Sequence, residues 1–308
     1  MTRCSGTDRA RLPAPIPVCR WTGTRRSVLG LTALMMAAAL WPLRAQTPQR
    51  IVSIIPAVTE MLFAIGGGAK VVGVSSYDRF PPEVSGLPRV GALLDPSVER
   101  ILSLKPDLVI LYATQTELKQ RLERAHIPYY SYEHRALSDI TATLRAIGVR
   151  VGASAPASRL ADEIERSIAA VSRSVEGRPR PKTLLVFERE GSALRNIYAS
   201  GGFGFLHDMV VAAGGENVFA DVKQQSVQAT SELILARRPE VIIELRYGDS
   251  VKTADIPREM QAWDALSSVP AVRTHRVHVL IGDEFVVPGP RVVGAVRRLA
   301  QVIHMVAK

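Results

Sequence analysis

The stretch Ser97-Val-Glu99-Arg-Ile-Leu-Ser-Leu-Lys105-Pro106-Asp107-Leu-Val-Ile110 has a counterpart 133 residues later, Thr230-Ser-Glu232-Leu-Ile-Leu-Ala-Arg-Arg238-Pro239-Glu240-Val-Ile-Ile243. Each copy runs through a capping Ser or Thr, a glutamate, an apolar pair, a basic residue before proline, an acid and a β-branched run. This order predicts a short capped helix that proline ends, followed by a buried strand. A duplicated helix–strand element indicates two similar lobes, with one exposed glutamate at the same place in each.

The rest of the chain extends this two-lobe pattern. A length of 308 residues fits two lobes, and a hydrophobic share of 47% is ample for packed cores. Strand and helix patterns alternate, which favours parallel-type sheets covered on both faces. We therefore predict an α/β fold with an N-terminal lobe over 46–152, an interlobe helix over 153–178 and a C-terminal lobe over 179–308.

The interlobe helix is the clearest single element. Within 154–175 apolar residues recur at steps of three and four, which predicts about six helical turns. Strands are expected at 51–55, 71–74, 108–112, 128–132, 183–187 and 277–281, and further helices at 59–65, 97–104, 115–125, 137–147, 204–213, 258–266 and 291–306.

The first 45 residues predict a cleaved export signal of the twin-arginine type. Arg25-Arg26 precede the apolar run 28–43, and Leu43-Arg44-Ala45 follows as a cleavage region. The run is shorter than the roughly 20 residues that span a bilayer. Two alternatives stay open, namely retention of this segment as a membrane anchor and a true start downstream of Met1.

Removal of residues 1–45 changes both the charge and the cysteine content. The full chain has a net charge of +10, but the segment holds seven Arg and one Asp, which leaves 32 basic and 28 acidic residues. No basic stripe interleaved with aromatics indicates a nucleic-acid partner. Cys4 and Cys19 both lie in the removed segment, so the mature chain needs neither a disulfide nor thiol chemistry. We expect a monomeric periplasmic protein.

The sequence lacks the motifs of the common enzyme classes. It has no G-x-G-x-x-G after a strand, no Walker loop and no G-x-S-x-G elbow. The glycine clusters at 66–68 and 214–215 end helices, the wrong geometry for phosphate binding. His275 and His278 are closely spaced, but on a strand approach they need not share a face. We predict no catalytic residue, no cofactor and no metal site, with an exported hydrolase as the alternative.

Several motifs carry a family resemblance. They are Ile51–Pro56, Thr59-Glu60, Val72–Tyr77, Pro81-Pro82, Leu104–Val109, Ala213–Phe219, Ser231-Glu232 and Pro290-Arg291. With them, residues 50–308 resemble the periplasmic substrate-binding proteins of ABC importers for corrinoids, haem and ferric siderophores, and within that family the vitamin B12-binding members. The resemblance implies two lobes joined by one rigid helix, a ligand held between the lobes, small closing motions and delivery to a permease dimer in the inner membrane.

The resemblance also implies a role for the two repeated glutamates. Glu99 and Glu232 stand where members of the family dock onto arginines of the permease. A carboxylate accepts bidentate bonds from Arg, and two such pairs fix orientation as well as position. The alternative is that each glutamate only complements the dipole of its own helix.

Candidate ligand contacts follow from the same motif positions. A large, mostly flat ligand needs apolar and aromatic walls with a few polar groups. We expect these contacts from Tyr77, Tyr112, Leu93, Phe203, Asp283, Phe285 and Arg291. Ordinary packing is the alternative for the tyrosines, and a structural ion pair is the alternative for Asp283 and Arg291.

A corrinoid is the favoured ligand, although Leu93 stands where the vitamin B12-binding members carry a tryptophan. Haem is the alternative, with Tyr77, Tyr112 or His207 as axial ligand, because Ala92 occupies the place of the usual axial tyrosine. Ferric siderophores come third. They carry negative charge and favour several cleft arginines, for which the candidates are Arg79, Arg189, Arg195, Arg246 and Arg291.

Overall fold

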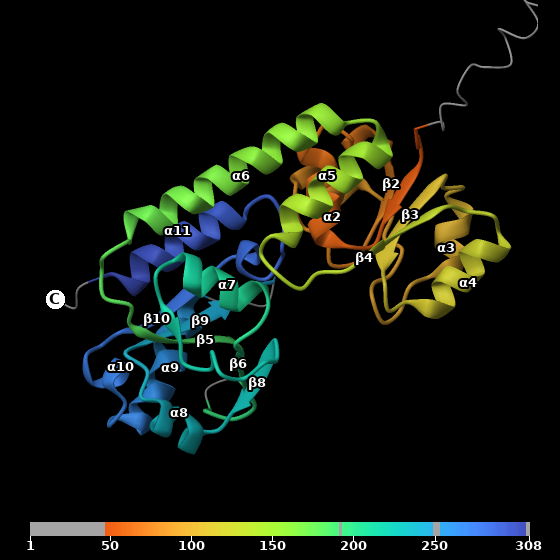
Figure 1. Cartoon of the computed structure of the whole chain (residues 1–308). Coiled ribbons are helices and arrows are strands. Elements are labelled where there is room, and N and C mark those ends of the chain that lie inside the picture. Colours follow the sequence, from red (N-terminus) through yellow and green to blue (C-terminus); the bar gives the residue numbers. More distant parts are fainter. Residues whose placement is uncertain (1–46, 191–192, 249–252, 306–308) are drawn as a thin grey trace, which may run out of the picture. The chain divides into compact units, whose positions relative to one another are not determined.

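The computed structural model describes residues 47–190, 193–248 and 253–305, so the export signal predicted at 1–45 lies outside the described residues (Figure 1). In these ranges no helix is both long enough and apolar enough to cross a membrane. The strands form two separate sheets, one from each half of the chain. Helix α6 (Ser154–Ser174) lies between them in the sequence and coincides with the stretch 154–175 in which apolar residues recur at helical spacing.

The first sheet contains four parallel strands in the order β2-β1-β3-β4. Its central strands are buried on both faces, as expected for a parallel sheet with helices on each side. We call this sheet with its helices the N-terminal lobe. Its elements are β1 Ile51–Ser53, α2 Pro56–Ala64, β2 Val71–Val74, α3 Val98–Ser103, β3 Leu108–Tyr112, α4 Thr116–Arg124, β4 Tyr129–Tyr132 and α5 Asp139–Val151.

The second sheet is mixed and belongs to what we call the C-terminal lobe. Strands β10, β9 and β5 are parallel, β7 also pairs with β5 in parallel, and β6 and β8 complete an antiparallel edge. The elements are β5 Lys182–Glu188, β6 Ile197–Ser200, α7 Phe205–Ala212, β7 Glu216–Asn217, β8 Ser226–Ala229, α8 Ser231–Arg237, β9 Val241–Arg246, α9 Ile256–Gln261, α10 Pro270–Arg273, β10 Val277–Ile281 and α11 Val292–Ile303.

The predicted α/β fold with two parallel-type sheets is therefore confirmed, with one difference. The strands β6 and β8 were not expected, because Ile197-Tyr-Ala-Ser and Ser226-Val-Gln-Ala are short and rich in small or polar residues. Such segments carry little of the apolar run that marks a buried strand. They become strands through tertiary pairing, because β6 pairs with the edge of β5 and β8 then pairs with β6.

Helix α6 packs against α5 near its start and against α7 and α11 further along (Figure 1). Its buried residues Ala157, Ala161 and Ile164 lie on one face, which is the reason for its spacing of apolar residues. The main apolar core runs from β1 and β3 through this face of α6 to α11. A second core, around Trp263 and Phe219, fills the other side of the second sheet.

The duplicated element folds the same way in both lobes. Ser97 Oγ accepts a hydrogen bond from the amide of Arg100 at 3.4 Å, and Thr230 Oγ1 accepts one from Leu233 at 3.2 Å. Both hydroxyls are helix N-caps. After each helix the basic residue before proline takes a left-handed conformation, with φ 46° at Lys105 and 52° at Arg238. The predicted order of cap, helix, proline and buried strand is thus confirmed twice.

The acid after each proline ties its strand to the first strand of its lobe. The Asp107 carboxylate accepts hydrogen bonds from the amides of Gln49 at 2.7 Å and Arg50 at 2.8 Å. In the second copy, Glu240 Oε2 accepts one from the amide of Lys182 at 2.8 Å. The acid therefore satisfies amides that would otherwise have no partner at the start of β1 and β5.

Replacement of Asp107 by alanine removes two hydrogen bonds to an ionised acceptor. Bonds of this kind contribute about 1.5–3 kcal/mol each when buried, and exposure of this carboxylate reduces their contribution. We expect Asp107→Ala to lower the free energy of unfolding by about 1–2 kcal/mol in urea titrations. Asp107→Asn keeps one acceptor oxygen and should lose less, whereas equal stability of Asp107→Ala and wild type would contradict the assignment.

Candidate functional site

A cavity of about 410 Å³ lies at the carboxyl ends of the strands of the first sheet. All four strands contribute, together with one loop of the C-terminal lobe that precedes α11. The carboxyl edge of a parallel sheet is where α/β proteins bind their ligands. The lining residues are Ile54, Ile55, Pro56, Ala57, Ser75, Tyr77, Ala92, Leu93, Tyr112, Tyr132, His134, Val286, Val287 and Pro288.

Three of the predicted contact residues meet in this cavity, namely Tyr77, Leu93 and Tyr112. Tyr77 is 64% exposed, in the turn that follows β2, and Leu93 is 40% exposed. Tyr112 ends β3 and is half-buried, and burial raises the pKa of its hydroxyl above the usual value. Its phenol therefore stays protonated at neutral pH and can donate a hydrogen bond to a ligand.

A buried glutamine holds two of these walls together, and sequence reasoning did not identify it. Gln115 Oε1 accepts a hydrogen bond from the amide of Tyr112 at 3.0 Å, and its Nε2 donates to the carbonyl of Leu93 at 2.9 Å. The end of β3 is thereby fixed against the loop that carries Leu93. The only local signal of this role in the sequence is the polar side chain of Gln115 directly before helix α4.

Tyr132 and His134 also line the cavity and were not among the predicted contacts. Their rings stack with centroids 6.2 Å apart, and His134 meets the ring of Phe205 edge-on at 5.3 Å. Burial lowers the pKa of His134, so its ring is neutral near pH 7. The alternation of Tyr130 and Tyr132 in β4 with His134 just after it was the available signal, since side chains two apart share a face of a strand.

The other four predicted contacts, Phe203, Phe285, Asp283 and Arg291, are not among the described lining residues of the cavity. Phe203 is 44% exposed in the bend before α7 and is not among the cavity's described lining residues. Phe285 is 0% exposed and packs in the core, with the guanidinium of Arg298 4.8 Å from its ring centroid. Phe285 therefore has a packing role here and offers no surface to a ligand, because its ring fills the space beneath α11.

Asp283 and Arg291 do not pair with each other. Asp283 Oδ1 accepts a hydrogen bond from the amide of Gly248 at 2.9 Å. Arg291 forms a bidentate pair with Glu60, with distances of 2.9 Å from Nε and 2.5 Å from Nη2 to the carboxylate oxygens. Burial raises the pKa of Glu60, against the opposing effect of Arg291. The signal for Glu60 was its position as the single acid in an apolar helix.

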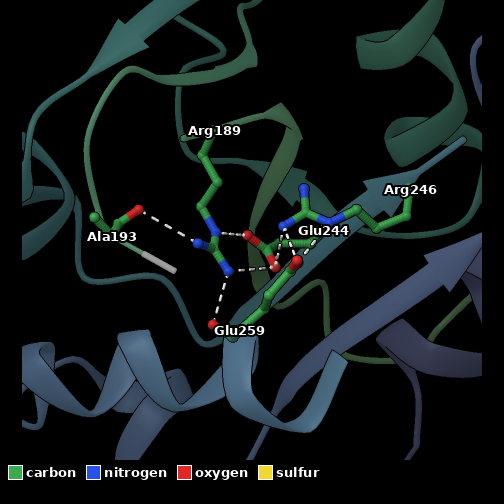
Figure 2. A network of polar contacts seen from close by, with 5 residues as sticks. All are labelled: Arg189, Ala193, Glu244, Arg246 and Glu259. Atoms are coloured by element: carbon green, nitrogen blue, oxygen red, sulfur yellow. Dashed lines mark hydrogen bonds and ion pairs between the residues drawn. The ribbon is translucent and has the colours of Figure 1, made fainter. Parts of the chain in front are cut away.

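Other candidate arginines are also matched by carboxylates. Arg189 and Glu244 form a fully buried ion pair, and Arg189 Nη2 also donates to the carbonyl of Glu259 at 2.7 Å (Figure 2). Arg246 donates to the carboxylate of Glu259 at 2.7 Å and lies 3.5 Å from that of Glu244. Arg195 is exposed beyond β5, outside this network. The network neutralises its own charges at the carboxyl ends of β5 and β9.

The histidines considered as ligands of haem iron or of a metal ion are not among the described lining residues of the cavity. His207 Nδ1 lies 3.3 Å from Asn217 Nδ2, and this histidine is not among the described lining residues of the cavity. His275 is exposed with φ 54°, whereas His278 Nε2 is buried. In the part of the chain that the structure describes, no three His, Cys, Asp or Glu residues gather as a metal site.

The two repeated glutamates occupy equivalent surface positions. Glu99 and Glu232 lie in the first turns of α3 and α8, and both are exposed. The pKa of Glu232 is lowered by hydrogen bonds from its own backbone amide and from Thr230. Both helix starts thus present a carboxylate to solvent at the same point of the repeat.

Asp78 is a buried acid beside the cavity. Its Oδ2 accepts a hydrogen bond from the amide of Ser75 at 2.7 Å, whereas Oδ1 has no partner among the described residues. Burial raises the pKa of Asp78 from 3.8 to about 7. Between these two values Asp78 is protonated in the folded protein and ionised in the unfolded chain, so its contribution to the free energy of unfolding falls as the pH rises.

The sequence profile of the periplasmic binding protein family matches residues 51–283. The vitamin B12-binding protein of Salmonella typhimurium is 28% identical over 278 residues, covering 90% of this chain and 97% of that protein. An uncharacterized ABC transporter substrate-binding lipoprotein of Bacillus subtilis is 29% identical over 262 residues, covering 83% and 80%.

Solved structures show the same fold. The periplasmic vitamin B12 binding protein of Vibrio cholerae superposes with a TM-score of 0.71 at 23% identity, covering 83% of this chain and 97% of that chain. The periplasmic heme-binding protein of a Roseiflexus species, in its apo form, gives 0.69 at 26% identity, covering 83% and 98%. The similar proteins therefore include a binder of vitamin B12 and a binder of haem.

Replacement of Asp78 by asparagine removes the buried titrating group. Between pH 4 and pH 7 we expect wild-type stability to fall relative to that of the variant by about 1–3 kcal/mol, because only wild type keeps the Asp78 carboxyl. Urea unfolding at several pH values measures both slopes. Asp264→Asn changes an exposed aspartate and should keep the wild-type slope, while parallel curves for Asp78→Asn and wild type would contradict the raised pKa.

Proposed function

Because this chain belongs to the periplasmic binding protein family and is a substrate-binding protein of the ABC transporter type, we propose that it captures a corrinoid between its two lobes and delivers it to an importer permease. In this proposal the chain is exported through its N-terminal signal and works in the periplasm as a monomer. It performs capture, a small closing motion and docking, without turnover of its ligand.

The observation that carries the proposal is the uncharged lining of the cavity. Among its described lining residues there is no Asp, Glu, Lys or Arg, and three tyrosines supply aromatic surface with hydroxyl groups. A corrin ring carries neutral amides around its rim, which suit such a wall. Haem carries two carboxylates and siderophores are anionic, and both gain from unpaired cations.

A corrinoid is larger than about 410 Å³, so part of the ligand must lie outside the cavity. Tyr77, Phe80 and Leu93 are all at least 40% exposed, and Tyr77 and Leu93 lie at the cavity itself. Exposed apolar groups grouped in this way are typical of a binding surface. We infer that one edge of the ring enters the cavity and that the rest lies along these side chains.

Haem is the second candidate, and one observation favours it. Tyr77 and Tyr112 both line the cavity, and a phenolate is a known protein ligand of haem iron. Tyr77 is the better candidate, because burial raises the pKa of the Tyr112 hydroxyl and so disfavours its phenolate. Siderophores have less support, because Arg189, Arg246 and Arg291 are held in ion pairs with glutamates.

Calorimetric titration of residues 46–308 with cyanocobalamin, hemin and a ferric siderophore tests the ligand assignment. We expect one-to-one binding of cyanocobalamin, weakened about tenfold by Tyr112→Ala, since removal of an aromatic wall typically costs about 1–2 kcal/mol. Tyr129→Ala changes a tyrosine of β4 that is not among the described lining residues and serves as the control. A shifted Soret band with hemin and no cobalamin binding would move the assignment to haem.

Reversal of both repeated glutamates tests docking. The double variant Glu99→Arg, Glu232→Arg places cations where the permease arginines are proposed to bind, so like charges oppose docking. We expect normal ligand affinity but loss of ligand uptake by cells that depend on this importer. Glu117→Arg, an exposed change on α4, is the control and should leave uptake unchanged. Wild-type uptake by the double variant would contradict the docking assignment.

A further inference from the structure

One ion pair joins the two lobes next to the cavity. Glu60 lies in α2 of the N-terminal lobe and is only 4% exposed. Arg291 directly precedes α11 of the C-terminal lobe, and its Nε and Nη2 each donate to one oxygen of the Glu60 carboxylate. Such a two-point contact fixes the direction of the guanidinium as well as its distance.

The charge of Arg291 is matched on its remaining sides. Its Nη1 lies 3.5 Å from Glu284 Oε2, and Glu284 is itself paired with Arg298 at 2.9 Å. The ring of Phe80 covers one face, with its centroid 4.3 Å from the guanidinium carbon. The guanidinium thus has a carboxylate on two sides and an aromatic ring on another.

The ion pair lies directly behind two walls of the cavity. Ala57, three residues before Glu60 on α2, lines the cavity, as does the segment 286–288 from the other lobe. Gly289 follows that segment, and a Cβ at this position would lie 2.9 Å from Glu60 Oε2. The carboxylate therefore lies against the backbone that continues the wall, and a side chain at position 289 would require this carboxylate to shift.

We propose that Glu60 is a positioning and specificity-determining residue of the ligand cavity. By holding Arg291 it fixes the 286–288 segment against α2, and it keeps the guanidinium from pairing with a carboxylate of the ligand. The cavity consequently favours a neutral ring periphery over an acidic one. The specificity part rests on the proposed binding of a tetrapyrrole-like ring, whereas the positioning part does not depend on the ligand.

The positioning part is tested on the ligand-free protein by amide hydrogen exchange. Glu60→Gln removes the charge that holds Arg291 and keeps the shape of the side chain. We expect the amides of Phe285, Val286, Val287 and Gly289 to exchange at least tenfold faster in this variant, since Pro288 has no amide hydrogen. Glu165→Gln breaks a similar bidentate pair, with Arg145, between α5 and α6 and away from the cavity, so it should leave this segment unchanged.

Unchanged exchange of 285–289 in Glu60→Gln would overturn the positioning role. If Glu60→Gln does not unfold cooperatively on heating, Arg291→Met is used instead, because it removes the same ion pair from the side of the other lobe. The same acceleration is expected there.

The specificity part is tested with cyanocobalamin and a derivative in which one rim amide is a carboxylate. Wild type should prefer the amide form, and Glu60→Gln should shift the affinity ratio about tenfold toward the carboxylate, because Arg291 then loses its bidentate partner and keeps only the longer contact with Glu284. The double variant Glu60→Gln, Arg291→Met should lose this shift. A loss of packing alone would weaken both ligands equally and leave the ratio constant, which would overturn the specificity role.

A wild-type protein that binds hemin and no corrinoid would end the corrinoid proposal without ending this inference. The same variants are then titrated with hemin, whose two carboxylates provide the same contrast. Tighter hemin binding by Glu60→Gln, reversed by the added Arg291→Met, supports the role of Glu60, and equal binding by all three proteins rejects it.

Discussion

Glu60 brings a carboxylate into an otherwise apolar helix, and the ionised form of a buried carboxylate is costly unless a cation pairs with it. Its partner, Arg291, comes 231 residues later and supplies two hydrogen bonds at once. Satisfying this one acid therefore brings α2 and the start of α11 together. The segment 286–288 lies between β10 and α11, just before Arg291, and it forms a wall of the cavity. The geometry of the candidate site thus depends on a pair that belongs to neither lobe alone.

The same principle of internal charge compensation extends across the C-terminal lobe. Arg189 and Glu244 are fully buried together, and Arg246 and Glu259 join them at the ends of β5 and β9 (Figure 2). Buried pairs of this kind add little net stability but fix which groups can lie side by side. They also withdraw guanidinium groups from a ligand. A receptor built in this way suits a neutral, partly aromatic ligand better than a polyanion.

The two lobes share an element but differ in the chemistry at its end. In the repeat register Leu111 corresponds to Glu244, and both are fully buried. At β3 the strand end opens onto an aromatic cavity, whereas at β9 it enters the ionic network. The shared part, with its cap, proline and exposed glutamate, remains on the surface of both lobes. The two copies therefore share their outward face and differ in their inward face.

The sequence by itself determined what depends on neighbours along the chain: the capped helices, the proline stops, the buried parallel strands, the long α6 and the tyrosines at strand ends. These follow from local hydrogen bonding and from the periodicity of apolar residues. Only the tertiary structure decided that Arg291 meets Glu60, that Phe285 is buried and that β6 and β8 form an antiparallel edge. Each of these depends on groups that are distant in sequence, or on space left by other elements, and no local pattern of residues encodes such contacts.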